Sequence, residues 1–456
     1  MSDGRSELPW WRALARGELE ELPDPLPIPA GRRLRGRVEP PPSKSVSHRY
    51  LTLALLSGRE VRVERLLQAD DLDLFVAALE RCGRAVRRDG DAVVVEPGFA
   101  PGEGDAVRLD CGNAGTMFRF LTAALTASPG RFVLDGTPRL RERPIAPLVD
   151  ALRQLGAGIR YLAAEGHAPL EIAGESLDGG SCALDASQSS QYLSALLMAG
   201  VRARRPLSIE VTALRSDPYV EVTAAALSTF GLGGASADGG RWSTLPARPD
   251  EIAAGPETVR VEADYSAVAY PAAGAAITGG EVLIEGVAVD SAQGDRRFLD
   301  LLAEMGAIVE WREGAVLVRG DRLRGVDVDL SALPDQVPTL AAVACFAAGP
   351  THIRNVAHLR HKESDRLSTV TLELRGSGFE VEEAADSLRI AGRSGSLPTE
   401  PVVVQTHDDH RIAMSLALVG LVRSGIEIAA PGVVAKSYPG FWRDLATLLS
   451  SDQAER

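Results

Sequence analysis

The sequence predicts an α/β protein of two domains, each built from three similar repeats of helices and strands. The chain has 456 residues, whereas an average domain has about 150. Six times along the chain, an apolar helix-like stretch runs into a glycine and then into an alternating strand-like stretch, at Gly58, Gly130, Gly200, Gly280, Gly349 and Gly425. These glycines are separated by 72, 70, 80, 69 and 76 residues. A single joint of this kind occurs in any α/β protein, but the regular spacing indicates a repeat.

Each joint predicts one helix followed by one strand. Glycine favours the left-handed backbone at the C-terminal end of a helix, and the alternation after it is typical of a strand with one buried face. The joints span residues 53–64, 125–136, 196–211, 275–286, 345–356 and 421–432. A second series of helices closed by glycine lies between them, over 78–88, 151–161, 227–234, 301–311 and 372–382. Most of these also run on into a strand, so each repeat should hold two helices and several strands.

Six repeats divide into two domains of three, with the break near residue 262. We expect a first domain over 44–262 and a second domain assembled from 25–43 plus 263–456. An N-terminal extension, residues 1–24, precedes them. Its sequence is compatible with a short amphipathic helix on the surface or with a frayed tail, and it has no apolar core like that of a secretory signal.

Composition excludes several classes of protein. The chain is 45% hydrophobic and 5% aromatic, which is typical of a globular protein rather than a disordered one. Its 62 acidic and 49 basic residues give a net charge of -13, which argues against a nucleic-acid or anionic-membrane surface. The four cysteines are far apart in sequence and form no CxxC pair, as expected for buried thiols of a cytoplasmic protein. No apolar run reaches the ~18 residues of a membrane span.

Polar clusters precede several of the expected helices. The sequence PPSKSVSHRY brings Lys44, Ser45 and Arg49 to the start of one, and DCGNAGTMFR brings Asn113, Gly115, Thr116 and Arg119 to the start of another. Helix N-termini present free N–H groups and partial positive charge, so these residue types favour anion binding. Gly115 has no side chain and allows a ligand to approach the backbone closely.

Further clusters follow along the chain. Three arginines, Arg139, Arg141 and Arg143, lie within five residues, and we expect some of them to be surface charges and at least one to reach a cleft. Ser189, Ser190 and Gln191 open the next helix, where a single serine would be enough for an N-cap. Later clusters contain Ser216 and Tyr219, Asp335, the KESDR stretch over 362–366, and Lys436.

The sequence HDDH over 407–410 could suggest a metal site. Neighbouring residues in a tight turn point apart, and no second histidine lies at the i, i+4 spacing of HExxH. We therefore favour a helix N-terminus capped by Asp408 or Asp409, with Arg411 directed at a ligand. No metal and no organic cofactor is expected.

Taken together, these stretches resemble the enolpyruvyl transferase family, and within it the branch that acts on shikimate 3-phosphate. The resemblance runs from about residue 35 to 443 and rests on eight motifs in the family's order: PPSKSVSHR, GNAGTMFR, PRLRERPI, SSQY, PDQ, KESDR, DHRIAM and AKSYPGF. It implies an inside-out α/β barrel in each of two domains. Each domain would have three βαβαββ repeats, with the active site in the interdomain cleft.

The resemblance also implies the reaction. The enolpyruvyl group of phosphoenolpyruvate is transferred to the 5-hydroxyl of shikimate 3-phosphate by addition and elimination, on the route to chorismate and the aromatic amino acids. Both substrates carry phosphate and carboxylate, which accounts for local clusters of donors in an acidic protein. The resemblance further implies a cytoplasmic monomer that acts on small molecules, and a target of the inhibitor glyphosate. We expect glyphosate to be affected more than phosphoenolpyruvate by a methyl group at Gly115.

Residue roles carry over position by position. The shikimate 3-phosphate set is Lys44, Ser45, Arg49, Ser189, Ser190, Gln191, Ser216, Tyr219, Asp335 and Lys362. The phosphoenolpyruvate set is Lys44, Gly115, Arg139, Gln191, Arg366, Arg411 and Lys436. Asp335 resembles the base that takes the 5-hydroxyl proton, Glu363 resembles the acid that protonates the methylene carbon, and Lys44 contacts both ligands. Supporting residues are Asn113, Thr116, Arg119 and His410.

Departures from the family pattern and two rival functions remain. Pro42, Phe120 and His358 stand where glycine, proline and asparagine are frequent, which bears on inhibitor sensitivity and fine substrate contacts. The related UDP-N-acetylglucosamine enolpyruvyl transferase usually carries a cysteine in its arginine-bearing loop, and TPRLRERP has none. A non-catalytic phosphometabolite-binding relative should have lost Asp335 or Glu363, and this chain has both.

Overall fold

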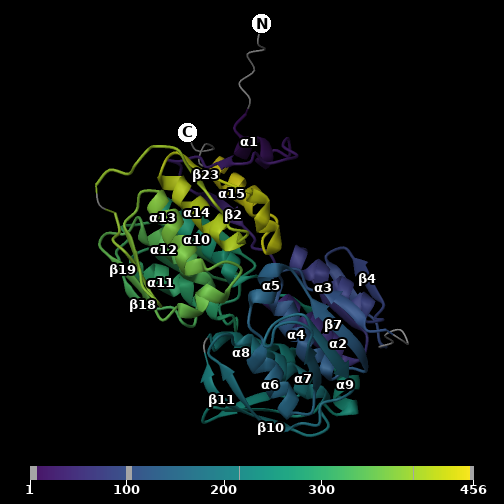
Figure 1. The fold of residues 1–456 in the computed structure, drawn as a ribbon. Helices are drawn as coiled ribbons and strands as arrows, with labels where there is room; N and C mark the ends of the chain where they lie inside the picture. Colours follow the sequence, from purple (N-terminus) through teal and green to yellow (C-terminus); the bar gives the residue numbers. More distant parts are fainter. Residues whose placement is uncertain (1–7, 99–104, 215, 394, 452–456) are drawn as a thin grey trace. The chain divides into compact units, whose positions relative to one another are not determined.

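The chain forms two compact units of mixed α/β structure (Figure 1), seen here in a computed structural model that describes residues 8–98, 105–214, 216–393 and 395–451. Unit 1 comprises Met1–Pro41, Ala263–Ser291 and Asp295–Arg456. Unit 2 comprises Pro42–Glu262 and Ala292–Gly294. Each unit has three β-sheets, so the described residues contain six sheets, and the predicted α/β fold class is confirmed.

In unit 2, each sheet has four strands joined in one pattern. One parallel pair is followed by two antiparallel neighbours, in the orders β14-β3-β5-β4, β6-β7-β9-β8 and β10-β11-β13-β12. The strands are β3 (Val61–Glu64), β4 (Val86–Asp89), β5 (Ala92–Val95), β6 (Val107–Asp110), β7 (Gly130–Asp135), β8 (Gly158–Tyr161), β9 (Leu170–Gly174), β10 (Gly180–Ala186), β11 (Leu207–Leu214), β12 (Ala235–Asp238), β13 (Arg241–Thr244) and β14 (Thr258–Arg260). The helices are α2 (Lys44–Ser57), α3 (Asp70–Arg81), α4 (Gly115–Thr126), α5 (Pro138–Glu142), α6 (Ala146–Gln154), α7 (Gln191–Ala199), α8 (Pro218–Thr229) and α9 (Pro249–Ala254), with the 3₁₀ turn η1 (Gly200–Arg202).

Unit 1 repeats this pattern in two sheets, β16-β17-β15-β2 and β18-β19-β21-β20, and adds a three-stranded sheet, β1-β23-β22. Its strands are β1 (Leu26–Pro27), β2 (Arg35–Val38), β15 (Glu281–Glu285), β16 (Ile308–Arg312), β17 (Ala315–Arg319), β18 (Asp327–Asp329), β19 (Thr351–Arg354), β20 (Val381–Glu383), β21 (Leu388–Ile390), β22 (Val402–Val404) and β23 (Ile426–Ile428). Its α-helices are α1 (Trp10–Ala15), α10 (Tyr265–Thr278), α11 (Arg297–Met305), α12 (Val337–Ala344), α13 (Arg366–Gly376), α14 (His410–Val422) and α15 (Phe441–Ser450). Four 3₁₀ turns complete it: η2 (Gly294–Arg296), η3 (Pro334–Gln336), η4 (Ala357–His361) and η5 (Pro431–Lys436).

Helices occupy the core of each unit. In unit 2, α2, α4 and α7 contact one another, and in unit 1, α10, α12 and α14 do. Almost every residue of these six helices is buried, including Thr122, Ser194 and Ser415. A helix that is buried on all sides has no need of a polar face, which explains the continuous apolar runs in the sequence.

The helices and strands of the glycine joints are present, but of the six first-series glycines only Gly58 ends its helix in the left-handed conformation. All six strands after the first-series glycines and all five helix–strand passages of the second series are present. Gly58 has φ 71° and ends α2 in the left-handed conformation, but α10 is closed by Gly279 rather than Gly280. Gly200 is right-handed (φ -59°) because η1 continues the turn after α7. At this joint β11 begins only at Leu207, after η1, and Gly200 does not end the helical turn.

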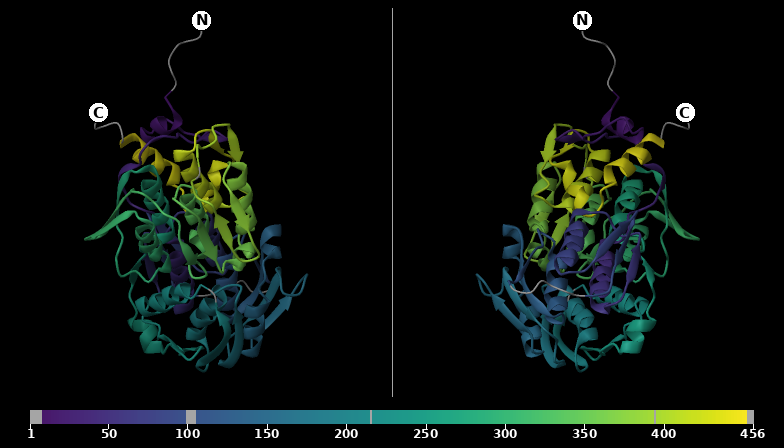
Figure 2. Two further views of the ribbon diagram at one scale, coloured as in Figure 1. Left: turned by 90° about the vertical axis from the view of Figure 1, so that its left-hand side faces the viewer. Right: turned by 90° about the vertical axis from the view of Figure 1, so that its right-hand side faces the viewer.

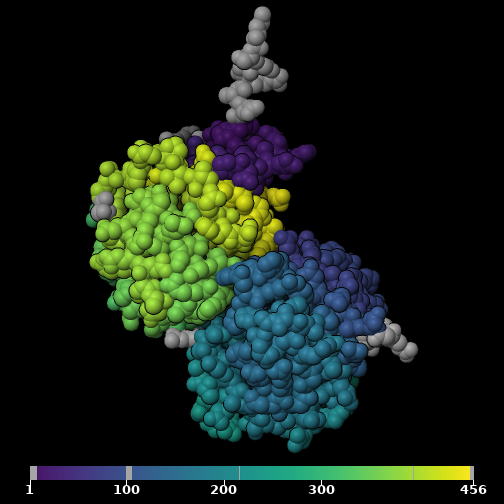
Figure 3. Space-filling view, in the orientation of Figure 1, coloured from purple at the N-terminus to yellow at the C-terminus, as the bar shows by residue number. Residues whose placement is uncertain are grey.

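The N-terminal extension contains a helix that belongs to unit 1. Trp10 and Trp11 of α1 are buried, and Trp10 Nε1 donates to the carbonyl oxygen of Pro27 at 2.6 Å. The Trp10 ring meets Trp442 of α15 edge-on, with 6.2 Å between centroids. Figures 2 and 3 show this N-terminal segment, in purple, against the C-terminal helix, in yellow. Of the two alternatives left open by the sequence, the packed helix is the one observed.

All four cysteines are buried and free of disulfides. Within the described ranges, no helix is long and apolar enough to cross a membrane.

Candidate active site

The start of α2 places Lys44 against a carboxylate that the sequence analysis missed. Ser43 is the N-cap, and its Oγ accepts from the backbone N–H of Val46. Lys44 Nζ lies 3.2 Å from Asp71 Oδ2, and both side chains are largely buried. Asp71 is in the first turn of α3, where negative charge is favoured by the helix dipole. The pair therefore fixes the lysine ammonium at the N-terminal ends of two helices.

Arg49 ties three helices of unit 2 together. It is 1% exposed. Its guanidinium donates to Thr223 Oγ1 (2.8 Å), to Ser194 Oγ (3.4 Å) and to the carbonyl oxygens of Ser45 (2.8 Å) and Tyr219 (2.7 Å). These acceptors are neutral, and burial lowers the pKa of Arg49 to about 10. The observed contacts of Arg49 join α2, α7 and α8, and its predicted role in ligand binding stays a prediction.

His48 and Phe120 also belong to this core rather than to a ligand surface. His48 Nδ1 lies 2.9 Å from the carbonyl oxygen of Lys44, and burial lowers the histidine pKa to about 4. Phe120, the departure from the family's frequent proline, is fully buried in α4 with its ring 5.3 Å from Arg49 Cζ. Pro42 directly precedes the Ser43 cap.

Gly115, the first residue of α4, is covered by an arginine. A Cβ atom at this position would lie 2.5 Å from both Cζ and Nη2 of Arg143 and 2.6 Å from Nη1. Arg143 is 5% exposed and donates from Nη1 to the carbonyl oxygen of Asn113 at 3.2 Å. The glycine is therefore required for the close approach of a guanidinium of the same unit. The approach of a ligand to Gly115 stays a prediction.

The three arginines after β7 have different surroundings. Arg139 pairs with Glu142 at 2.7 Å on α5 and is partly exposed. Arg141 pairs with Asp135 at 2.6 Å and is about half exposed. Only Arg143 is buried. The resemblance assigns Arg139 to the ligand and gives Arg143 no role.

Gln191 is held from α4 by two of the predicted supporting residues. Arg119 Nη1 donates to Gln191 Oε1 at 2.6 Å, and Gln191 Nε2 donates to Thr116 Oγ1 at 2.9 Å. Ser190 stands at the N-cap of α7 without a side-chain cap bond, whereas Ser189 Oγ accepts from the N–H of Gln191 at 3.3 Å. The two serines and the glutamine thus gather at the first turn of α7.

Ser216 and Tyr219 lie at the start of α8. Ser216 is buried and has φ 58°, a left-handed conformation that is uncommon for serine and is found at turns and functional sites. Its carbonyl oxygen accepts from the N–H of Tyr219 at 3.2 Å.

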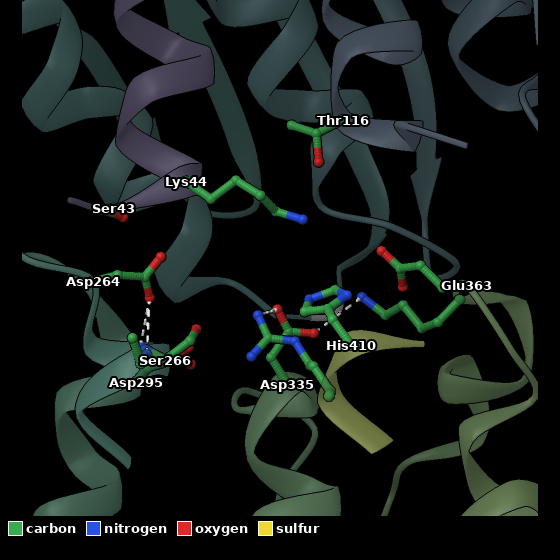
Figure 4. Close-up of polar contacts among 12 residues, drawn as sticks. Ser43, Lys44, Thr116, Asp264, Ser266, Asp295, Asp335, Glu363 and His410 are labelled. Carbon is green, nitrogen blue, oxygen red and sulfur yellow. Dashed lines mark hydrogen bonds and ion pairs between the residues drawn. The ribbon is translucent and has the colours of Figure 1, made fainter. Parts of the chain in front are cut away.

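In unit 1, one arginine joins the two carboxylates predicted as base and acid. Arg366 donates from Nη1 to Asp335 Oδ1 at 2.8 Å and from Nη2 to Glu363 Oε2 at 2.7 Å. Its Nε donates to Asp409 Oδ2 at 2.7 Å, and Nη2 lies 3.3 Å from Asp409 Oδ1. The guanidinium is 1% exposed, and its three carboxylate partners raise its pKa above the ordinary value against the effect of burial. Figure 4 labels Asp335 and Glu363 among the residues of this cluster.

Asp335 has cations on several sides. Arg411 Nη2 donates to its Oδ2 at 2.7 Å, and Lys362 Nζ lies 4.0 Å from its Oδ1. Burial alone would raise the pKa of this carboxyl group, but Arg411, Lys362 and Arg366 together hold it well below its usual range. Arg411 Nη1 also reaches the Tyr270 hydroxyl at 3.4 Å, and burial raises the pKa of Tyr270 to about 12.

The HDDH turn before α14 is a helix N-terminus. His407 and Asp408 have left-handed backbones, with φ 51° and 55°. Of the two predicted cap residues, Asp409 is the one used, since its Oδ1 accepts from the N–H of Arg411 at 3.0 Å. His407 Nε2 lies 2.8 Å from Glu373 Oε1, and His410 is fully buried beside Asp409. No three His, Cys, Asp or Glu side chains gather as metal ligands in the described part of the chain.

A second acidic group lies near Asp335. Asp264 caps α10 by accepting from the N–H groups of Ser266 (2.8 Å) and Ala267 (3.2 Å). Ser266 Oγ donates to Asp295 Oδ2. Burial, followed by the charge of Asp335, raises the pKa of Asp295 to about 6. Figure 4 shows Asp264, Ser266 and Asp295 together.

The predicted residue Lys436 and the family departure His358 lie in 3₁₀ turns of unit 1. Lys436 is the last residue of η5 and is buried. His358, in η4, is buried as well. The described structure therefore gathers the predicted site residues into two groups, one at helix starts of unit 2 and one around Arg366 in unit 1.

Comparisons with known proteins show which family this chain is similar to. A family model described as EPSP synthase (3-phosphoshikimate 1-carboxyvinyltransferase) matches residues 28–445. A protein of that name from Syntrophobacter fumaroxidans is 42% identical over 419 residues, covering 91% of this chain and 98% of the relative.

Solved structures show the same similarity. EPSP synthase from Acinetobacter baumannii superposes with a TM-score of 0.74 at 27% identity, covering 91% of this chain and 96% of that one. The enolpyruvyl transferase NikO from Streptomyces tendae, at 20% identity and a TM-score of 0.72, covers 92% of this chain and 96% of its own and shares the fold. The chain belongs to the EPSP synthase family.

Proposed function

We propose that this chain transfers the enolpyruvyl group of phosphoenolpyruvate to the 5-hydroxyl of shikimate 3-phosphate, giving 5-enolpyruvylshikimate 3-phosphate and phosphate. The observation that carries the proposal is the shared guanidinium of Arg366, which holds Asp335 at 2.8 Å and Glu363 at 2.7 Å. Addition followed by elimination needs one group to take a proton and another to give one, and two carboxylates on one cation can be kept in different states.

Asp335 is the proposed base for the 5-hydroxyl. Its three cationic neighbours make it a weak base, because they favour the ionised form. Phosphoenolpyruvate brings negative charge to Arg366 and Arg411, which are assigned to it. Neutralising these two cations raises the pKa of Asp335 towards values at which it can accept a proton. The base is then active only when the second substrate is present.

Glu363 is the proposed acid. The oxygen of the 5-hydroxyl forms a bond to C2 of phosphoenolpyruvate as its proton passes to Asp335. The electron pair of the C2–C3 double bond takes a proton from Glu363, so that C3 becomes a methyl group. The tetrahedral adduct then expels phosphate, which takes the proton held by Asp335. The Glu363 carboxylate takes back one methyl proton, which restores the double bond. No step requires a metal or an organic cofactor.

The residues of unit 2 are proposed to bind the anionic groups. Lys44, held by Asp71 at 3.2 Å, supplies a fixed positive charge to both substrates. Gln191, fixed by Arg119 and Thr116, and the serines at the start of α7 supply hydrogen bonds. Charge-assisted hydrogen bonds of this kind are the strongest available to phosphate and carboxylate groups.

Three further features stay proposals. We take 44–262 and 25–43 plus 263–456 as the two domains, preceded by the extension 1–24. The cytoplasm is the proposed location, because four free cysteines persist in a reducing compartment. The monomeric state remains a prediction from the resemblance.

A phosphate-release assay tests the function. Purified protein with phosphoenolpyruvate should release phosphate only when shikimate 3-phosphate is added, and the rate should be unchanged in excess chelator. UDP-N-acetylglucosamine in place of shikimate 3-phosphate is the matched control. Turnover with the control alone would support the rival transferase. Binding of both substrates without turnover would support a non-catalytic relative.

A further inference from the structure

Arg143 lies against the residue that the proposed function assigns to phosphoenolpyruvate. The space that a side chain at position 115 would occupy is filled by the Arg143 guanidinium, at 2.5 to 2.6 Å from the position of a Cβ atom. Atoms this close cannot coexist, so any other residue at position 115 must move Arg143. The contact is specific to the planar end of the side chain, because the three atoms concerned are Cζ, Nη1 and Nη2.

The same guanidinium holds the turn before α4. Its Nη1 donates to the carbonyl oxygen of Asn113 at 3.2 Å, and the N–H of Gly115 bonds to that oxygen at 3.1 Å. Arg143 thus bonds to Asn113 and lies against Gly115, and the residue is 5% exposed.

The Arg143 guanidinium lies at the start of α4, whose first residue is Gly115. The helix dipole is positive there, so the guanidinium and the dipole add their positive charge at one place.

We propose that Arg143 is a positioning and specificity-determining residue of the phosphoenolpyruvate site. It holds the turn from Asn113 to Gly115 in place for the phosphate group, and glycine is needed at position 115 to admit the guanidinium. The proposal rests on the proposed function, in which Gly115 belongs to that site. It changes the expected action of Gly115→Ala: the methyl group displaces Arg143 and acts on the ligand through it.

A double-mutant cycle tests the proposal. Gly115→Ala and Arg143→Ala should each raise the KM for phosphoenolpyruvate about 10-fold or more, while the KM for shikimate 3-phosphate changes less than about 3-fold. Because both changes remove the same guanidinium from the same place, the double variant should be no more than about twofold worse than the weaker-binding single variant. A KM for phosphoenolpyruvate in the double variant that equals the product of the two single fold-changes would contradict the proposal.

Chemical rescue separates positioning from a general structural role. Guanidinium ion at millimolar concentration should lower the KM for phosphoenolpyruvate in Arg143→Ala, where the space is vacant. It should not do so in the double variant, where the alanine methyl fills part of that space. Rescue of both variants, or of neither, would overturn the assignment. Arg141→Ala, from the same segment but paired with Asp135 and half exposed, is the control and should stay within about twofold of wild type.

Failure of the proposed function and failure of the Arg143 proposal can be distinguished, because turnover tests the first and phosphate binding tests the second. Failure of the wild-type protein to turn over phosphoenolpyruvate would refute the proposed function. The same cycle, read by calorimetric binding of inorganic phosphate, would still decide the role of Arg143. If Arg143→Ala does not fold, Arg143→Lys replaces it. Lysine keeps the charge without the planar group, and it should restore less than half of the lost affinity.

Discussion

Arg49 in unit 2 and Arg366 in unit 1 are equally buried, but the partners of Arg49 are neutral and those of Arg366 are negatively charged. Arg49 meets hydroxyl and carbonyl oxygens, and its pKa falls to about 10. Arg366 meets three carboxylates, and its pKa rises. A cation whose hydrogen-bond partners are neutral has a structural role, because none of these partners gains or loses a proton. A cation shared by three carboxylates couples their protonation states, and for this reason we assign the proposed proton transfer to unit 1.

The largest effect that follows from this comparison is on the rate. Asp335→Asn and Glu363→Gln should each lower kcat by about 10² to 10⁴, the usual contribution of a positioned proton-transfer group. Both variants can still hydrogen-bond to Arg366, so thermal unfolding should remain cooperative. Asp365→Asn, which alters the cap of α13 two residues from Glu363, is the control and should affect stability more than rate. Normal turnover of either variant would remove its assigned role.

The next effect is on stability. Arg366→Met leaves three carboxylates without their shared cation and should cost about 3–5 kcal/mol at pH 7. Arg49→Met leaves only neutral acceptors and should cost about 1–3 kcal/mol. Denaturant unfolding of both variants gives the two values.

The stability losses of Arg366→Met and Arg49→Met should differ in their dependence on pH. In the wild-type protein the pKa of Asp335 is depressed, so its contribution is present above the ordinary value of 3.8 and is lost as the pH falls. The cost of Arg366→Met should therefore shrink below about pH 4, whereas the cost of Arg49→Met should stay constant. If the stability cost of both substitutions had the same pH dependence, the proposed difference between the two arginines would be wrong.

Many of the helices and strands could be predicted from the sequence, because their signals come from residues close together in the chain. Helix N-termini, glycine joints and apolar runs depend on neighbouring residues, so α2, α4 and α7 and the strands after them were predicted. Asp71 was missed because it meets Lys44 across 27 positions of sequence. Arg143 could not be distinguished from Arg139 because α5 is only five residues long and gives no periodicity that reveals a buried face.

Some long-range pairings have no local signal at all. β1, near the N-terminus, pairs with β23, some 400 residues later. The cluster around Arg366 draws Asp335 and Asp409 from 31 positions before it and 43 after it. The resemblance supplied Asp335 but gave no role to Asp409, which only the folded structure brings to the guanidinium.

A smaller effect is expected at the Lys44–Asp71 pair. Asp71→Asn keeps a polar partner for Lys44 but removes the charge that holds the ammonium, and it should raise the KM for phosphoenolpyruvate about 3- to 10-fold. Asp73→Asn, on the same helix but exposed and paired with Arg88, is the control and should have no effect on KM. Equal effects of the two changes would show that Asp71 has no special role.

The smallest effect concerns Asp295. Its pKa is raised to about 6 by burial and by Asp335, so its stabilising contribution is present below about pH 4 and is lost as the pH rises through 6. Asp264, Ser266 and Arg411 also act on this carboxyl group. Asp295→Asn should therefore gain stability relative to wild type between pH 4 and 7. Urea unfolding at four pH values measures this, and a constant difference would contradict the raised pKa.

The central claim is that C3 of phosphoenolpyruvate is protonated before phosphate leaves. Mass spectrometry of 5-enolpyruvylshikimate 3-phosphate formed in D₂O tests it most directly. The methyl group of the adduct would carry one deuterium and two protons, so the product methylene should contain deuterium, and formation of this labelled product should be suppressed in Glu363→Gln. Product formed at a normal rate in D₂O without deuterium in its methylene group would contradict the account.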